Sequence, residues 1–364
     1  LQDRTARPKE ETPSAPAGAA LERRLGARQS LQTRERQQAR MSAAVAPFWA
    51  QYPAPPSEEE GAIMVNTVDA KGVAMRASET AGERGKKKMA LLGSVYSIAP
   101  YRRTPEEVLE ALFADPHRQR EKPGPARPKP LHKQVRACLA RDAHDTTAPQ
   151  TAAVFDWIAQ ENAQRNPGQR KPTVVLIDGQ DSLWRAAWEF VPGEEVTEIL
   201  DILHVAGYVW EAAHRLSGSD SDRARAWAKT QLGAILEGHV AEVIARLRPH
   251  VQQHSGEARK RLEGICTYLS NNSHRMAYDA YLAEGFPIAT GVIEGACRHL
   301  VKDRMERSGM RWTVRGAQAL LELRSVAISQ LWEPFMDFRI RSELTRLYGA
   351  EAANDDQFEL PIAA

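Results

Sequence analysis

The amino-acid sequence of 364 residues contains no apolar run long enough to cross a membrane. Uncharged apolar runs such as residues 174–177 fall far short of the ~20 residues that a membrane-spanning helix needs. Residues 1–60 also lack a basic stretch followed by an apolar one, so nothing in them indicates secretion. We therefore expect a cytoplasmic protein with no membrane contact.

Cysteine and net charge are equally scarce. The three cysteines, Cys138, Cys266 and Cys297, lie far apart without a Cys-x-x-Cys pair, which excludes a disulfide framework and a thiolate zinc site. The 49 Lys and Arg residues against 47 Asp and Glu give a net charge of +2, so the total charge indicates no nucleic-acid partner. A content of 42% hydrophobic and 26% charged residues is ordinary for a globular protein.

The N-terminal region, residues 1–60, is poor in residues that could form a core. Its first 40 residues are rich in Arg, Gln, Ala and Pro, and such a composition cannot offset the entropy of ordering. A helix over 19–44, exposed or dependent on a partner, fits the composition, and the prolines at 53, 55 and 56 predict a linker. The folded part should begin near Gly61. The first residue is Leu1 rather than Met, which leaves open that the chain is a fragment.

The order of strands and helices after Gly61 predicts an α/β fold. The clearest strand is 173–177, whose apolar run bounded by Pro172 and Gly179 is typical of a parallel strand buried on both faces. Residues 222–282 are helical by pattern throughout. The resulting domain prediction is a core in 61–216, an all-α insertion in 217–286, helices completing the core in 287–349 and a flexible tail in 350–364. The other elements expected are strands at 62–75 (with a tight turn at 69–72), 89–98, 133–139 and 196–203, and helices from Thr104, over 150–162, 182–190 and 209–216, and in the region after Gly291.

Three acids occupy positions suited to chemistry. Asp178 ends the buried strand and Asp69 lies in the first strand, and functional groups gather beyond the carboxyl ends of strands in open α/β sheets. Glu294 opens a late helix, four residues after Thr290 rather than the three that a capping box requires. Structural alternatives stay open: Asp178 as a helix cap, Asp69 as a turn residue and Glu294 as an acid favoured by the helix dipole.

Basic residues gather near Glu294. The segment from Arg298 to Arg315 contains six Lys or Arg residues and only two acids. Such a cationic surface would suit the phosphate backbone of a nucleic acid. Trp312 within this run can stack on a base or pack in the core. The candidate DNA contacts are Lys86, Lys87, Lys88, Arg298, Lys302 and Arg311.

Three carboxylates on separate elements can bind two divalent ions ~3.5 to 4 Å apart, the arrangement that cleaves phosphodiesters. Oxygen ligands favour Mg²⁺ or Mn²⁺ over zinc. We therefore expect two such ions held by Asp69, Asp178 and Glu294.

Several segments together resemble a known family. They are Val-Asp69-Ala-Lys-Gly, Val-Val-Leu-Ile-Asp178-Gly, Asp201-Ile-Leu-His204 and above all Gly-Val-Ile-Glu294-Gly-Ala-Cys-Arg-His-Leu-Val-Lys-Asp-Arg-Met-Glu-Arg-Ser-Gly-Met-Arg-Trp. The sequence from about Gly61 to Gly349 resembles the ISKra-type DDE transposases of bacterial insertion sequences. The resemblance implies a ribonuclease-H-like mixed sheet flanked by helices, with an all-α insertion ahead of the helix that bears the catalytic Glu.

The resemblance also assigns residues to roles. It implies Asp69, Asp178 and Glu294 as the catalytic acids, and Asp201 and His204 as a supporting Asp-x-x-His signature. For His204 a buried core histidine is the alternative, and for Asp201 a structural acid that pairs with it. Two departures are the short N-terminal region where the family carries a DNA-binding region, and Ala70 where the family commonly has Gly.

The functional expectation is a transposase that cleaves element ends and joins them to target DNA, as a homo-oligomer assembled on DNA. One alternative is a nuclease on the same core, which hydrolyses DNA without joining. The other is a truncated remnant that binds DNA or a partner without catalysis.

Overall fold

The structure is a computed structural model that describes residues 31–82, 85–114, 126–139, 148–191, 193, 196–306 and 309–349. It is an α/β fold built on one five-stranded mixed sheet, as predicted, in the order β3-β2-β1-β4-β5. The first three strands are antiparallel neighbours, whereas β4 and β5 run parallel to β1. The strands are β1 (Ile63–Ala74), β2 (Lys87–Ile98), β3 (Leu131–Leu139), β4 (Thr173–Ile177) and β5 (Val196–Leu200).

The prediction of a buried parallel strand at 173–177 is confirmed. All five residues of β4 are buried, because the strand lies between β1 and β5 with helices on both sides. The predicted turn at 69–72 is wrong, and so is the reading of Asp69 as a turn residue. Asp69 pairs with Leu92 and Gly72 with Met89 in an unbroken ladder, so the pairing with β2 overrides the local turn signal.

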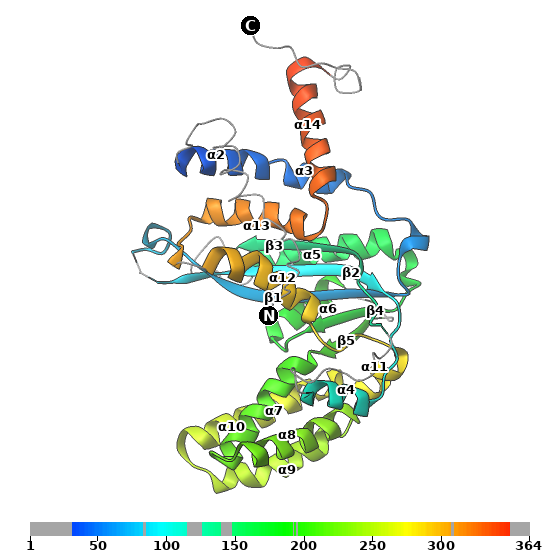
Figure 1. Cartoon of the computed structure of the whole chain (residues 1–364), viewed down its shortest axis with the longest axis vertical. Coiled ribbons are helices and arrows are strands. Elements are labelled where there is room, and N and C mark those ends of the chain that lie inside the picture. The colour runs from blue at the N-terminus through cyan, green and yellow to red at the C-terminus, as the bar shows by residue number, and fades with distance from the viewer. Residues whose placement is uncertain are drawn as a thin grey trace, which may run out of the picture.

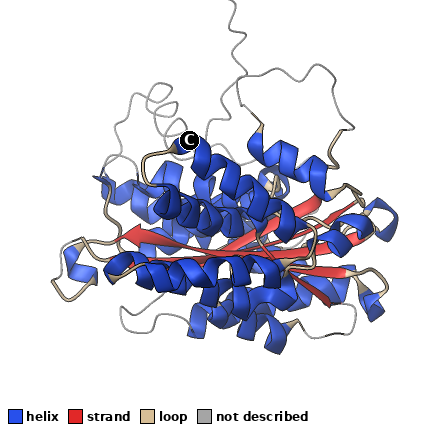
Figure 2. Ribbon diagram, turned by 90° about the horizontal axis from the view of Figure 1, so that it is seen from below, coloured by secondary structure: helices blue, strands red, loops and turns tan. Residues whose placement is uncertain are grey.

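Helices cover both faces of the sheet, as the edge-on view in Figure 2 shows. On one face α5 (Ala148–Arg165) packs on β2 and β3, and α6 (Asp181–Phe190) packs beside it. On the other face lie α12 (Gly291–Cys297), the π-helical segment Arg298–Glu306 and α13 (Val314–Ile328). The predicted late helices therefore exist, but a π-helix follows Cys297, a geometry found often at functional sites.

A group of helices separates β5 from α12 in the sequence and forms the lower part of the molecule in Figure 1. The stretch predicted to be helical, 222–282, is helical. Helix α4 (Pro105–Phe113) joins this group by packing on α8, and it begins with the predicted Thr104 cap, which forms a full capping box with Glu107. The group consists of α7 (Ile202–Ser217), α8 (Ser221–Leu236), α9 (Val240–Gln253), α10 (Gly256–Asn272) and α11 (Tyr278–Glu284).

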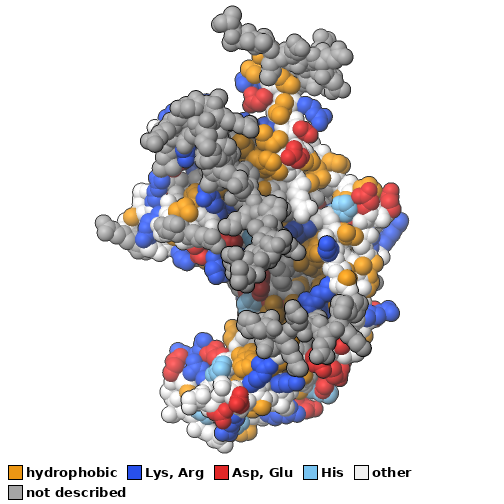
Figure 3. Space-filling model, in the orientation of Figure 1, with side chains coloured by type: hydrophobic (Ala, Val, Ile, Leu, Met, Phe, Trp, Pro, Cys, Tyr) orange, Lys and Arg blue, Asp and Glu red, His pale blue; other side chains and the backbone are white. Residues whose placement is uncertain are grey.

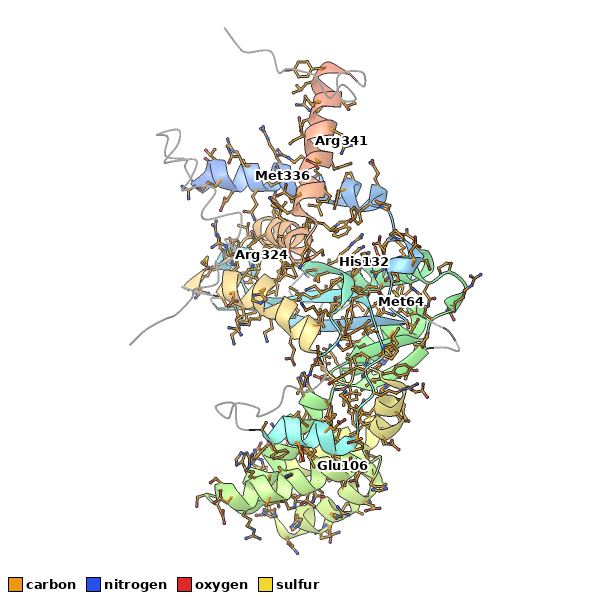
Figure 4. All side chains as sticks on the ribbon, turned by 45° about the vertical axis from the view of Figure 1, so that its right-hand side comes forward. Met64, Glu106, His132, Arg324, Met336 and Arg341 are labelled. Atoms are coloured by element: carbon orange, nitrogen blue, oxygen red, sulfur yellow. The ribbon has the colours of Figure 1, made fainter. Side chains whose placement is uncertain are left out.

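The packed chain starts before Gly61. Helices α2 (Leu31–Ser42) and α3 (Val45–Gln51) lie beside α13, and α3 buries Phe48 and Trp49 against Val326 and Phe335. The folded part therefore begins earlier than the predicted Gly61, because this aromatic pair packs in the core. Helix α14 (Trp332–Tyr348), which carries Met336 and Arg341, projects at the end of the molecule opposite Glu106 of α4 (Figure 4). The predictions for 1–30 and 350–364 lie outside the described residues.

Side chains from helices cover both edges of the sheet. At the β3 edge, Val135 N donates to Ser329 Oγ at the C-cap of α13, at 2.9 Å. Leu139 N donates to Gln318 Oε1 of α13, also at 2.9 Å. At the β5 edge, Tyr278 Oη donates to Leu200 O at 2.7 Å and Tyr281 Oη donates to Glu198 O at 3.2 Å. These bonds occupy backbone groups that an open edge would offer to another strand.

Within the described ranges, no helix has the length and apolar character needed to cross a bilayer. The three cysteines are free thiols.

Candidate active site

Asp178 is the first residue after β4, at the carboxyl end of the strand. Its Oδ1 accepts a hydrogen bond from Gln180 N at 3.2 Å, and its backbone O accepts one from Tyr268 Oη at 2.8 Å. Burial raises the pKa of Asp178 above its usual value, and the nearby Asp69 and Asp201 charges add to this rise, whereas His204 opposes it. The N-cap of α6 is Gln180, so Asp178 does not cap the helix.

Asp201 follows β5 and begins α7, which starts at Ile202 rather than at 209 as predicted. The Asp201 side chain is fully buried and accepts four hydrogen bonds, from Leu203 N, His204 Nδ1, Thr290 N and Thr290 Oγ1. Burial alone would raise the pKa of Asp201, but these donors outweigh it and hold the pKa below its usual value. Because four donors surround its two oxygens, Asp201 serves to position its neighbours.

His204 joins two of the acids. Its Nδ1 lies 3.1 Å from Asp201 Oδ2 and its Nε2 lies 3.8 Å from Asp178 Oδ2, while 44% of its side chain is exposed. The alternative of an enclosed core histidine is therefore wrong. The hydrogen bond to Asp201 is the largest cause of the raised pKa of His204, and the Asp178 charge adds to it.

Glu294 lies in the first turn of α12 with an exposed side chain. Its Oε1 is 3.4 Å from Thr290 Oγ1, whose closer contact is Asp201 Oδ2 at 2.6 Å. Among the described residues, Asp201, His204 and Glu294 form the one group of three possible metal ligands whose donor atoms all lie within 4.8 Å of one another. Glu294 therefore lies close to His204 and Asp201.

Asp69 lies half-buried in the middle of β1, and its Oδ1 accepts a hydrogen bond from Ala70 N at 2.7 Å. The buried Cys297 thiol of α12 is hydrogen-bonded to Asp69. Burial raises the pKa of Cys297, and the charges of Asp69 and Glu294 raise it further. Since the charge of Asp69 also acts on Asp178, the three predicted acids border one region of the molecule.

The donor set fits a hard divalent cation. Within the described chain, no Lys or Arg forms an ion pair with Asp69, Asp178 or Glu294. The basic groups nearby are His204, 3.8 Å from Asp178, and Lys71, whose charge acts on Cys297 beside Asp69. Carboxylate oxygens left without a cationic partner are the ligands that Mg²⁺ and Mn²⁺ prefer. The three predicted acids do not form the tightest group of possible ligands. That group contains Glu294 with Asp201 and His204, whereas Asp69 and Asp178 lie outside it.

A pocket of about 370 Å³ opens beside these residues. It is lined by Leu203, His204, Gly207, Tyr208, Glu211 and Glu294. The space-filling view in Figure 3 shows the molecule hollowed on the left, between the sheet-containing upper part and the helical lower part. The pocket gives solutes access to His204 and Glu294.

The predicted DNA contacts have different surroundings. Arg298 has 69% of its side chain exposed, 3.8 Å from Asp303, and Lys302 and Arg311 are exposed too. Lys87 is exposed but pairs with Glu306 at 3.1 Å, which joins the start of β2 to the π-helical segment.

Two other residues of this region are less exposed. Lys86 is partly buried, and Lys88 is only 5% exposed, which contradicts its prediction as a DNA contact. Lys88 lies inside β2, opposite Val73. Trp312 packs in the core, since its Nε1 donates to Met305 O and its ring contacts the cluster under α12.

Sequence reasoning missed Thr290, Tyr268 and Cys297. Thr290 stands before a helix, where its hydroxyl would be expected to cap, but it bonds to Asp201 instead. Tyr268 comes from α10, 90 residues after Asp178, and no local pattern links them. Cys297 follows Glu294 by almost one helical turn, a spacing that could have suggested a shared face.

Comparison of the chain with protein-family models, with curated proteins and with solved structures yields no match in any of the three.

Proposed function

We propose that the chain cleaves and joins DNA phosphodiesters with the help of divalent ions, as a transposase of the DDE type on a ribonuclease-H-like core. The observation that carries the proposal is the placement of three acids from distant segments at one side of the sheet. Asp69 lies on β1, Asp178 follows β4, and Glu294 on α12 faces the same histidine as Asp178. Two further features support it: the mixed sheet, and the helices between β5 and the helix bearing Glu294.

Asp69, Asp178 and Glu294 would hold two Mg²⁺ or Mn²⁺ ions. When bound, such ions activate a nucleophilic oxygen and stabilise the leaving oxygen of a phosphodiester. Asp201 holds His204 through Nδ1, which leaves Nε2 directed toward Asp178. His204 would thus set the charge and orientation of the Asp178 carboxylate.

The exposed cations of the π-helical segment would hold the DNA backbone. Arg298 and Lys302 follow Glu294 by four and eight residues, so they extend along the same surface away from the acids. Each phosphate that a Lys or Arg neutralises releases counterions, which gives the binding its dependence on salt. The same proposal includes assembly as a homo-oligomer on DNA and a location in the cytoplasm, where the DNA lies.

A cleavage assay on supercoiled plasmid with Mg²⁺ or Mn²⁺ tests the proposal. Asp178→Asn and Glu294→Gln should each lower cleavage by more than about 100-fold, beyond the 10–100-fold typical of a residue that only supports a ligand. Asp181→Asn is the matched control, because Asp181 is an exposed acid three residues from Asp178.

The products separate the candidate functions. Joined molecules indicate a transposase, whereas nicked circles alone indicate a nuclease. Binding without cleavage by the unmodified chain would match an inactive remnant. Cleavage that survives both substitutions, or that continues in EDTA, would refute the proposed site.

A further inference from the structure

Three tyrosines of the inserted helices donate hydrogen bonds to backbone carbonyls of β5 and of the residue that follows β4. Tyr278 and Tyr281 of α11 reach Leu200 O and Glu198 O on the outer strand. Tyr268 of α10 instead reaches Asp178 O, at the residue whose carboxylate belongs to the acidic site. The inserted helices therefore contact the acid directly, and not only the sheet edge.

Tyr268 restrains the peptide after Asp178 in a second way. Gly179 has a φ of +100°, which side-chain-bearing residues rarely adopt, and a Cβ there would lie 2.8 Å from the Tyr268 ring. The ring thus occupies the space that a side chain at 179 would fill. Because glycine leaves its own backbone loosely restrained, contact with Tyr268 limits how far the Asp178 peptide can rotate.

The ring of Tyr268 is itself held in place. It packs on Tyr208 of α7 with ring centroids 4.1 Å apart, and Tyr208 lines the pocket that holds His204 and Glu294. Burial raises the pKa of Tyr268 far above its usual value, so its hydroxyl remains a donor at every physiological pH. A contiguous set of contacts therefore runs from α10 to the acids.

We propose that Tyr268 is a positioning residue for Asp178, through which the inserted helices set the affinity of the acidic site for divalent cations. The inference rests on the proposed function, because it takes Asp178 as a cation ligand. Rotation of the 178–179 peptide moves the Asp178 carboxylate, whose Oδ1 is held by Gln180 N on the far side of the same glycine. Tyr268 keeps that carboxylate within reach of the region that Asp69 and Glu294 border.

The test is the affinity for Mn²⁺, measured on the full chain without DNA from the electron paramagnetic resonance signal of free Mn²⁺. Tyr268→Phe keeps the ring but removes the hydroxyl, and should weaken Mn²⁺ binding by about three- to tenfold, the factor that one neutral hydrogen bond typically contributes. Tyr281→Phe is the matched control, since it removes a hydroxyl bond to a backbone carbonyl on the same edge away from Asp178.

Thermal unfolding of both variants separates positioning from a purely structural role. Both should lose similar stability, but only Tyr268→Phe should lose Mn²⁺ affinity. If Tyr268→Phe does not fold, Tyr208→Leu takes its place, because it removes the ring on which Tyr268 packs and leaves the backbone at Gly179 unchanged. Equal Mn²⁺ affinity in the variant and the unmodified chain overturns the inference alone. An unmodified chain that binds no Mn²⁺ overturns the proposed function itself.

Discussion

The ion pair between Glu60 and Arg165 offers a sharp test of the packing that supports the sheet. Both side chains are fully buried, with Nε to Oε1 at 2.7 Å and Nη2 to Oε2 at 3.0 Å. Ser97 Oγ also donates to Glu60, and Gly61 N donates to Ser97 Oγ at 2.8 Å. The pair thus fixes the entry into β1 against the end of α5.

Glu60→Gln keeps the shape of the side chain but leaves the buried Arg165 charge without its closest anion, since the remaining one, Glu161 Oε2, lies 3.8 Å from Nη1. Breaking a buried pair in this way costs about 3–5 kcal/mol. Since the unfolding entropy is about 2.1 cal/mol/K per residue, 1 kcal/mol shifts the midpoint by roughly 1.6 °C for a unit of about 300 residues, and Tm should fall by about 5–8 °C. Replacing both residues, as Glu60→Leu with Arg165→Met, should recover part of the loss because the buried cation is removed with its anion, although Glu161 loses its contact with Arg165.

Thermal unfolding followed by circular dichroism measures the effect. Glu59→Gln is the control, because the neighbouring Glu59 is 58% exposed and its ion pair with His132 at 3.5 Å should contribute at most about 1 kcal/mol. Burial opposes ionisation of Glu60, but Arg165 and Ser97 hold its pKa below the usual value. Its contribution to stability is therefore present above the unfolded pKa of about 4.3 and is lost as the pH falls through the folded pKa. Equal shifts for Glu60→Gln and Glu59→Gln at pH 7 would refute this reasoning.

Two further predictions concern the candidate site. Asp201→Asn should lower the pKa of His204 toward its usual value, because the Asp201 hydrogen bond is the largest cause of the rise; nuclear magnetic resonance titration of the imidazole measures it. Asp220→Asn, at the N-cap of α8, should leave that pKa unchanged, and a shift in both variants would contradict the assignment. Arg298→Ala should reduce the slope of log binding constant against log salt by about 0.9 on duplex DNA, as read by fluorescence anisotropy. Arg346→Ala on the projecting α14 should leave the slope as it is, and an equal loss would place the DNA elsewhere.

The parts of the fold predicted correctly from the sequence are those set by short-range rules. The run at 173–177 is bounded by turn-forming residues and is apolar on both faces. Neither face suits exposure to solvent, so the run predicts a central strand. Thr104, followed by Pro and two acids, predicts the start of α4. The Thr side chain accepts a backbone hydrogen bond, Pro lacks the N–H that would be unpaired there, and the acids favour the helix dipole. The sequence singles out Asp178 and Glu294 because a carboxylate after an apolar strand, or beside several cations, is unusual, and their catalytic role stays a prediction.

The parts predicted incorrectly depend on partners far away in the chain. Residues 69–72 have a turn-like composition, but β2 supplies a complete ladder for them. Asp201 reads as the end of a strand, whereas Thr290, 89 residues later, fixes it at the start of α7. Phe48 and Trp49 precede the predicted start of the folded part at Gly61, and they pack against α13 and α14 near the other end of the chain. No local pattern can announce such contacts.

The coverage of the two sheet edges has a consequence for synthesis. The covering residues of the β3 edge, Gln318 and Ser329, are made long after the strands themselves. Ser329 comes 129 residues after Leu200, which ends β5 (329 − 200). At roughly 5–20 residues per second the ribosome needs about 6–26 s to make them. During this interval all five strands of the nascent chain have been synthesised, but the residues that cover the β3 edge have not. We therefore expect the ribosome-bound chain to be the form that most needs a chaperone.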